Sequence, residues 1–553
     1  MKLTFLGAAH EVTGSRFFLE ACGKYWLIDY GMEQGVNLYE NVPLPVAAEK
    51  IEAVFLTHAH IDHSGWLPLL YKEGFRGAIY ATGPTVDLCR IMLLDSAYIQ
   101  EMEAEWKNRK AVRSGRELVE PLYTQQNATD TVALFRACQY KETVPVCPGM
   151  SLRFIDVGHL LGSASIEINI TEGMETQRLV FSGDIGNVNQ ALIRDPEYVT
   201  EADYVIMEST YGDRNHGAVP DYVNSMAQIL QKTFDRGGNV VIPSFAVGRT
   251  QEMLYLLRKI KQEKLVQGHE GFPVYVDSPL AIEATSIFDK NALVCADEET
   301  AALIRSGINP IAFDGLERTV TAEQSKLINE STTPKVILSA SGMCEAGRIR
   351  HHLKHNLWRP ESTILFVGYQ SVGTLGRSLT DGAKEVKLFG ETLEVRAEIL
   401  KLSGVSGHAD RDGLIKWITS IESKIQHVFV VHGDDEVAES FSAHLRDALK
   451  LNASAPYNGE QWDLSHCTML QEGNRVKVKK PVAAGAADTT GEAPSKAKKS
   501  ELKRTGNPAY DQLVMAVKKL TGLTERMAGG KGKDLQKLAD EIHLLYKKYK
   551  KRV

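Results

Sequence analysis

Short apolar runs bounded by glycine or polar residues recur over the first 210 positions of the chain. Runs of this length between turn residues are typical of β-strands. The clearest are residues 25–28, 53–56, 78–80, 152–155, 164–168 and 179–181. Residues from about 84 to 140 differ, because the charged stretch 101–107 lies at their centre and predicts helix. The pattern indicates a mixed sheet system with helices outside it.

The pattern of predicted elements changes over residues 212–395. There, short apolar strands alternate with predicted helices near 221–236 and 249–263. The strands lie at 239–243, 274–276, 335–338 and 363–367. Continuously apolar strands between helices indicate a parallel sheet that is buried on both faces. We therefore expect an α/β domain at 212–395, inserted into a first domain made of 1–211 and 396–480.

The end of the chain has a different composition. Residues 481–505 are low in complexity and predict a flexible linker. Residues 506–553 predict a basic helical tail with one apolar stripe of Leu535, Leu538, Ile542, Leu545 and Tyr549. The last 60 residues carry a net charge of +10 in a chain of net charge −6. Such a tail favours contact with a polyanion; a solvated helix face and a homodimer interface stay as alternatives.

Composition narrows the class of protein. Hydrophobic residues make up 43% of the chain and charged residues 24%, which are ordinary values for globular proteins. No apolar run is long enough to span a membrane, so we expect no membrane partner. The start of the chain lacks a signal-peptide pattern. Seven cysteines without a CxxC pair predict reduced thiols and a cytoplasmic protein.

The densest candidate chemistry follows the predicted strand at 53–56. There His58, His60, Asp62 and His63 fall within six residues. On an extended backbone His58 and His60 point to the same side, because side chains alternate along a strand. Asp62 and His63 follow as the chain turns and are placed to serve a second ion. Imidazole and carboxylate ligands together suit zinc or a similar divalent metal.

Four further metal-ligand candidates each lie at the end of a predicted strand. They are Asp29, His159, Asp184 and His432. A single strand-end His or Asp is most often structural. Their joint order along the chain, Asp, HxHxDH, His, Asp and His, is what predicts a two-metal site.

This order resembles the metallo-β-lactamase fold, and specifically its β-CASP branch of nucleases. Glu208 in MESTYGD and His408 in SGHAD match additional motifs of that branch. The inserted segment resembles it at PSFAVGRTQE, DSPLA, SGM and VGYQ. The resemblance covers about residues 1–470. It extends to prokaryotic homologues of the endonuclease subunit of the cleavage and polyadenylation specificity factor and, more distantly, to RNase J.

The resemblance implies an αββα sandwich with an inserted α/β β-CASP domain, and two Zn²⁺ ions for which Mn²⁺ can substitute. By the family pattern one ion is held by His58, His60 and His159. The other is held by Asp62, His63 and His432, and Asp184 bridges the two. Asp29 would fix a ligand imidazole through its other nitrogen. The expected catalytic residues are Asp62, Glu208 and His408, with His408 as general acid and Glu208 as its partner.

Alternatives stay open for several of these residues. Glu208 would also suit an ion pair at a domain junction, and His408 a turn. Ser341 and Gly342 would offer backbone N–H groups to RNA phosphates or only form a tight turn. Ser406 is a further candidate for phosphate contact, and Arg249 either contacts RNA or pairs with a carboxylate inside the inserted domain.

The leading hypothesis is a zinc-dependent ribonuclease that hydrolyses single-stranded RNA, as an endonuclease, a 5′–3′ exonuclease or both. A DNA-directed β-CASP nuclease is the second. A noncatalytic RNA-binding scaffold is the third, and it predicts missing metal ligands. Hydrolysis of a small lactam or thioester is the fourth, but an inserted domain of that size fits a polymer better.

Overall fold

The computed structural model describes residues 1–478, except 36–37, 115–116, 218–220, 372 and 403–405. Residues Met1–Lys479 form one compact unit. The expected linker at 481–505 and the tail at 506–553 lie outside the described residues. None of the described helices has the length and apolar character that crossing a membrane requires.

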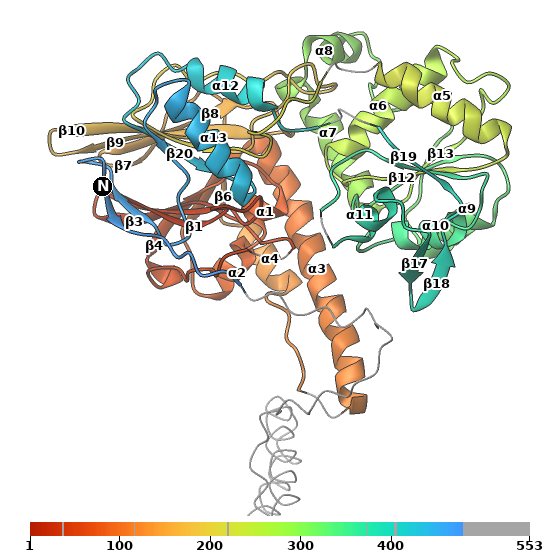
Figure 1. The fold of residues 1–553 in the computed structure, drawn as a ribbon, viewed down its shortest axis with the longest axis horizontal. Helices are drawn as coiled ribbons and strands as arrows, with labels where there is room; N and C mark the ends of the chain where they lie inside the picture. The colour runs from red at the N-terminus through yellow and green to blue at the C-terminus, as the bar shows by residue number, and fades with distance from the viewer. Residues whose placement is uncertain (36–37, 115–116, 218–220, 372, 403–405, 479–553) are drawn as a thin grey trace, which may run out of the picture. The chain divides into compact units, whose positions relative to one another are not determined.

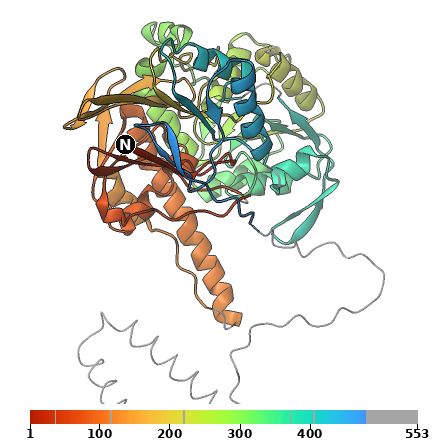
Figure 2. The same ribbon diagram turned by 60° about the vertical axis from the view of Figure 1, so that its left-hand side comes forward.

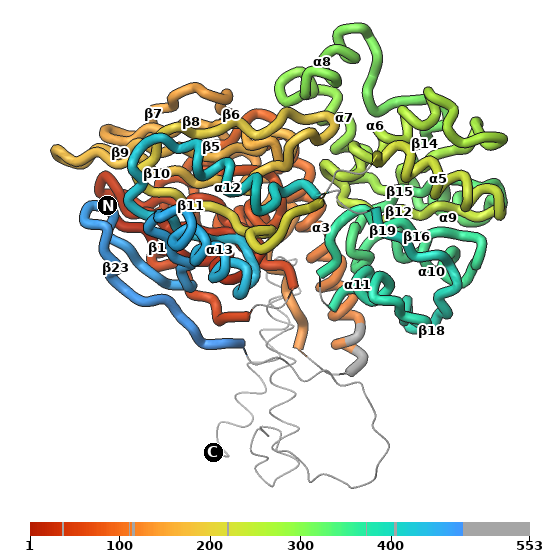
Figure 3. Tube along the Cα trace, turned by 45° about the horizontal axis from the view of Figure 1, so that its top comes forward, coloured from red at the N-terminus to blue at the C-terminus, as the bar shows by residue number. Residues whose placement is uncertain are grey.

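Two mixed sheets form the first part of the fold (Figure 1). The eight-stranded sheet has the order β23-β22-β1-β2-β3-β4-β5-β6. Its strands are β1 Lys2–Gly7, β2 Arg16–Ala21, β3 Lys24–Tyr30, β4 Ile51–Phe55, β5 Ala78–Thr82, β6 Phe135–Cys138, β22 Gln461–Asp463 and β23 Thr468–Gln471. The last two strands come from far along the chain: β22 pairs with β1, and β23 pairs with β22 at the edge of the sheet (Figure 3).

The seven-stranded sheet has the order β21-β20-β11-β10-β9-β8-β7. Its strands are β7 Val144–Cys147, β8 Met150–Asp156, β9 Ala164–Glu172, β10 Glu175–Phe181, β11 Tyr204–Glu208, β20 His427–Val431 and β21 Ala453–Ser454. Strands β10, β11 and β20 run parallel. Strand β8 is antiparallel to β9, which is antiparallel to β10, so β8 points the same way as β10.

Side chains alternate along each strand, so that one set packs between the two sheets and the other set packs under the helices on the outer faces. Phe5 and Phe55 of the first sheet meet Phe181 and Phe429 of the second in one apolar cluster. The outer face of the first sheet is covered by helices α1 Ile61–Ser64, α2 Leu67–Lys72, α3 Gly83–Ser114 and α4 Gln125–Val132. Helices α12 Arg411–Thr419 and α13 Asp435–Asp447 cover the second sheet. The layers are therefore αββα, as predicted; α3 extends well past them (Figure 2).

The inserted segment forms a six-stranded sheet of order β14-β13-β15-β12-β16-β19, parallel throughout. Its strands are β12 Val240–Pro243, β13 Val274–Val276, β14 Leu316–Arg318, β15 Val336–Ser339, β16 Thr363–Phe366 and β19 Glu398–Lys401. Helices α5 Tyr222–Asp235, α6 Arg249–Gln262 and α7 Pro279–Cys295 pack on one face. Helices α9 Ala322–Glu330, α10 Ile349–Asn356 and α11 Leu375–Thr380 pack on the other (Figure 1).

The remaining elements are the 3₁₀ turn Ala48–Lys50, α8 Glu298–Arg305 and the hairpin of β17 Glu385–Leu388 with β18 Glu391–Glu394. Two expectations need correction. The sheet of the inserted domain includes β19, which lies beyond the expected boundary at residue 395. Strand β6 falls within the region expected to be helical. Both are edge strands with partly exposed side chains, so neither carries a continuous apolar run.

Candidate metal centre

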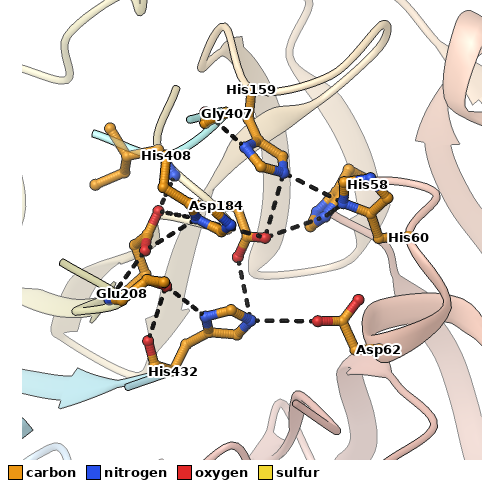
Figure 4. A network of polar contacts seen from close by, with 12 residues as sticks. His58, His60, Asp62, His159, Asp184, Glu208, Gly407, His408 and His432 are labelled. Atoms are coloured by element: carbon orange, nitrogen blue, oxygen red, sulfur yellow. Dashed lines mark hydrogen bonds and ion pairs between the residues drawn. The ribbon is translucent and has the colours of Figure 1, made fainter. Parts of the chain in front are cut away.

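The candidate ligands gather because the strands that precede them end at the same edge of the two inner sheets. His58 and His60 follow β4, and His159 follows β8. Asp184 follows β10, and His432 follows β20. Figure 4 shows their side chains converging from these separate elements.

The first cluster consists of His58, His60, His159 and Asp184. Nδ1 of His60 lies 3.1 Å from Nε2 of His58 and 3.2 Å from Nε2 of His159. Oδ2 of Asp184 lies 3.4 Å from Nε2 of both His58 and His159. Ligands about 2.1 Å from a tetrahedral ion are about 3.4 Å from one another, so these four atoms have the spacing of a metal's ligand shell.

The second cluster consists of Asp62, His63 and His432. Nε2 of His432 lies 3.5 Å from Oδ2 of Asp62 and 3.5 Å from Oδ1 of Asp184. Nε2 of His63 lies 3.2 Å from the same Oδ1. Asp184 therefore turns one carboxylate oxygen toward each cluster, which is the position of a bridging ligand.

Unsatisfied polar atoms support metal binding at these clusters. Oδ1 of Asp184 and Nε2 of His432 are buried and lack a hydrogen-bond partner among the described residues. Buried polar groups normally have partners, and an orphaned group calls for an ion or a water. Because both atoms point into the second cluster, its residues fit a divalent ion, as the ligand spacing of the first cluster does for another.

A second layer of contacts selects which imidazole nitrogen faces each cluster. Oδ2 of Asp29 lies 2.7 Å from Nδ1 of His63, and both oxygens of Asp29 also accept hydrogen bonds from Thr57. The carbonyl of Gly407 lies 2.9 Å from Nδ1 of His159. The hydroxyl of Thr210 lies 3.1 Å from Nδ1 of His432. In each case Nε2 is left for the metal, which is how outer contacts orient ligands.

Three of these outer contacts were not predicted from the sequence. Thr57 directly precedes the ligand run and Thr210 lies two residues after Glu208. That adjacency is the one local signal that would have pointed to them. Gly407 acts through its backbone carbonyl, which no residue pattern encodes.

Glu208 and His408 form a pair beside the first cluster. Nδ1 of His408 lies 3.1 Å from Oε1 of Glu208 and 4.0 Å from Oδ2 of Asp184. Glu208 is buried, and its carboxylate accepts hydrogen bonds from the backbone N–H groups of Ile185 and Thr210. Burial alone would lower the pKa of His408, but Glu208 and Asp184 outweigh it and raise the pKa to about 9. The pair occupies Nδ1 and leaves Nε2 as the nitrogen that can face a substrate.

The expected RNA contacts occupy different places. Ser406 lies beside His408, and its hydroxyl accepts the backbone N–H of His408 at 3.2 Å. Ser341 and Gly342 follow β15 at the carboxyl edge of the inserted sheet. Arg249 forms a mostly buried ion pair with Glu252, one turn along α6.

Three family models match the chain. Residues 19–193 match a metallo-beta-lactamase superfamily domain, 250–379 a Beta-Casp domain, and 392–456 a Zn-dependent metallo-hydrolase RNA specificity domain. A protein named ribonuclease TTHA0252, from Thermus thermophilus, is 37% identical over 79% of this chain and 94% of its own length. The chain belongs to the β-CASP family of metallo-β-lactamase hydrolases. The resemblance inferred from the motifs is thereby confirmed.

Other β-CASP relatives are named transcription termination factor FttA. Those of Methanosarcina mazei and Methanocaldococcus jannaschii are each 31% identical, over 83% of this chain and 71% of their own length. A solved structure of a protein of unknown function from Enterococcus faecalis covers 85% of this chain and 99% of that chain, with 12% identity and a TM-score of 0.47. That likeness is too weak to inform the site.

Proposed function

We propose that this β-CASP protein is a zinc-dependent ribonuclease that hydrolyses phosphodiester bonds of single-stranded RNA. The observation that carries the proposal is the pair of ligand clusters shared by Asp184, with Glu208 and His408 beside them. Relatives named ribonuclease and transcription termination factor support an RNA substrate, as does the match to an RNA specificity domain. All seven cysteines are free thiols, which suits a cytoplasmic location.

The side chains divide the chemistry between them. His58, His60 and His159 would hold one ion, and Asp62, His63 and His432 the other, with Asp184 between them. Two divalent ions there would supply an acidified water and neutralise charge on the phosphate oxygens. Glu208 holds the imidazole of His408 in a fixed orientation through Nδ1. Nε2 of His408 then donates a proton to the leaving ribose oxygen.

The test is cleavage of 5′-labelled single-stranded RNA by the wild-type protein and by two variants. Asp184→Ala removes the bridging carboxylate, so metal content and cleavage should both be lost. Glu208→Gln should keep the metal, but kcat should fall about 100-fold or more because the general acid loses its charged partner. Removal of metal by a chelator should abolish cleavage, and Zn²⁺ or Mn²⁺ should restore it. Full cleavage by Asp184→Ala would refute the two-metal assignment.

Matched RNA, DNA and circular RNA substrates test which nucleic acid is cleaved and whether cleavage is internal or from the 5′ end. The DNA strand of the same sequence should be cleaved far more slowly than the RNA; equal rates would favour a DNA-directed nuclease. Circular RNA is cut only by an endonuclease, so its cleavage separates that mode from a 5′–3′ exonuclease. A wild-type protein that binds metal and RNA and cleaves neither strand would be a scaffold.

A further inference from the structure

Two large aromatic side chains stay exposed at the carboxyl edge of the inserted sheet. Phe245 follows β12 and is 41% exposed; Tyr369 follows the neighbouring strand β16 and is 53% exposed. The connection after β12 leads to α6 on one face, and the connection after β16 leads to α11 on the other. In open α/β sheets, ligands bind in the crevice where neighbouring connections leave toward opposite faces.

Glycines of the flanking strands make room for the ring of Phe245. A Cβ atom added to Gly342, after β15, would lie 3.2 Å from the backbone nitrogen and 3.3 Å from the ring of Phe245. One added to Gly368, after β16, would lie 3.6 Å from the ring. The backbone nitrogen of Thr250 anchors the residue by donating to the carbonyl of Phe245 at 3.2 Å. The ring therefore rests on a glycine shelf and keeps an exposed surface.

The loop that carries Phe245 lies beside the loop that follows His159. Ala246 and Val247, which follow Phe245, share an apolar cluster with Leu160 and Leu161, which follow the ligand His159. A Cβ atom added to Gly248 would lie 3.0 Å from Leu160. A small cavity lined by His159, Leu160 and Gly248 lies between the two loops. The loop that carries Phe245 thus packs directly on the loop that carries a metal ligand.

Tyr369 lies on the loop after β16, where Nε2 of the next residue, Gln370, donates to the carbonyl of Gly342 at 3.0 Å and so ties this loop to the shelf. Partial burial raises the pKa of its phenol, and the charges of Asp434, Arg377 and Arg214 also act on it. The guanidinium of Arg214 lies 4.7 Å over the ring of Tyr211, and that ring lies 6.2 Å from the ring of His408. Arg214, Tyr211 and His408 therefore form one cluster, and the charge of Arg214 also acts on Tyr369.

We infer that Phe245 and Tyr369 are stacking platforms for unpaired bases of the RNA strand whose scissile phosphate lies at the metal centre. The inference rests on the proposed function. Single-stranded RNA is commonly bound by stacking its bases on aromatic side chains, and this tolerates any sequence because every base has a π-face. Side chains as large and apolar as Phe are usually buried, so an exposed ring on a glycine shelf beside a phosphodiesterase site fits a base.

The experiment measures KM and kcat of the full-length protein on intact RNA and on RNAs with one abasic ribonucleotide near the cleaved bond. Removal of the stacked base should raise KM of the wild type about 5- to 100-fold at one or two positions. Phe245→Ala should raise KM on intact RNA by a similar factor. On the RNA that lacks the base stacked on Phe245, the variant and the wild type should have the same KM. Tyr369→Ala should behave in the same way at a different position.

Conservative variants separate stacking from a structural role. Phe245→Tyr and Tyr369→Phe keep the ring and should keep KM near the wild-type value, whereas Phe245→Leu fills the shelf without a π-face and should match Phe245→Ala. Trp358→Ala is the matched control, because Trp358 is also 53% exposed but follows α10, at the opposite edge of the same sheet. Its KM should not change.

One result overturns the inference and leaves the proposed function intact. In it, Phe245→Ala and Tyr369→Ala still cleave RNA, but each variant either leaves KM unchanged or raises it by the same factor on intact and abasic strands. If the wild type binds RNA without cleaving it, the proposed function fails. The same RNAs are then compared by fluorescence anisotropy, where equal losses of affinity on intact and abasic strands would again reject stacking.

Discussion

At the residue scale, the metal centre depends on small contacts that choose which nitrogen of each imidazole points inward. Asp29 illustrates this because it contacts Nδ1 of His63 at 2.7 Å and is itself held by Thr57. A carboxylate can only accept here, so the proton of His63 is kept on Nδ1 and Nε2 is free to bind metal. The expected ligand His63 is therefore oriented by a residue that belongs to neither cluster.

Asp29→Asn should weaken metal binding at the second cluster about 10- to 100-fold. The amide can present an N–H group to His63, which would favour the wrong tautomer. Metal content after dialysis against graded chelator, measured by mass spectrometry, tests this. Asp435→Asn is the control, since Asp435 lies 2.8 Å from Nδ1 of His10, which belongs to neither cluster. Equal metal content in Asp29→Asn and the wild type would refute the role of Asp29.

At the element scale, close packing of loop backbones holds the short helix α1 in place. The backbone nitrogen of Met32 donates to the carbonyl of Ile61 at 2.9 Å, and that of Ser15 to the carbonyl of Asp62 at 2.8 Å. Gly31 lies so near that an added Cβ would be 1.7 Å from the carbonyl oxygen of Asp62. No side chain fits there, so any substitution must displace the helix that carries Asp62 and His63.

Gly31→Ala should therefore lose metal from the second cluster and reduce the rate of RNA cleavage about 100-fold, the usual effect of an error of about 1 Å in position. Metal stoichiometry and kcat are the measurements. Gly83→Ala at the start of α3 is the control, because an added Cβ there meets nothing within 4 Å. A Gly31→Ala protein with full metal content would show that α1 can move without loss of the site.

A buried network joins the helices of the inserted domain to its sheet. Asp277, which follows β13, contacts Nη1 of Arg348 and Nε2 of His352, each at 2.7 Å, and accepts hydrogen bonds from Thr319 and Ser325. Burial alone would raise the pKa of Asp277, but His352, Ser325 and Thr319 outweigh it and hold the pKa well below its usual range. The charged carboxylate therefore stabilises this domain.

Asp277→Asn should reduce the free energy of unfolding by about 3 kcal/mol at neutral pH. Because the folded pKa lies below the unfolded value of about 4, the contribution is full above that pH and is lost as the pH falls below it. The difference between wild type and variant should therefore shrink in acid. Urea unfolding of chelator-treated protein at several pH values measures it. Asp463→Asn, which breaks a pair with the exposed His466, should cost less than about 1 kcal/mol.

At the scale of the whole molecule, the sequence predicted those strands that are buried on both faces of their sheet. Strands β12 and β15 were predicted because both of their faces are covered, which requires a continuous apolar run. The edge strands β6 and β19 were missed because their outer side chains meet solvent.

The convergence of the expected metal ligands followed from their positions at strand ends. Their outer contacts did not, because backbone carbonyls such as that of Gly407 carry no sequence signal. The pairing of β1 with β22 could not be predicted from the sequence either, because the two strands lie at opposite ends of the described chain.

The charge distribution of the chain gives the last prediction. All seven expected metal ligands lie between residues 58 and 432, whereas the excess of positive charge lies in the last 60 residues. If the tail binds RNA phosphates, changing six of its lysines to Gln should weaken RNA binding and flatten its dependence on salt, by about 0.7 in log–log slope for each phosphate that is no longer neutralised. The six are Lys518, Lys519, Lys547, Lys548, Lys550 and Lys551. Cleavage at saturating RNA should persist because the ligands are untouched.

The same six lysines changed to Arg keep the charge and should keep both the affinity and the slope. The apolar stripe expected in the tail offers the competing role, as a homodimer interface. In that case Leu538→Ser with Leu545→Ser would halve the mass measured by light scattering, and the Gln variant would bind RNA as tightly as the wild type. Because charge and stripe are changed separately, the two experiments assign the tail to RNA, to a second copy of the chain, or to both.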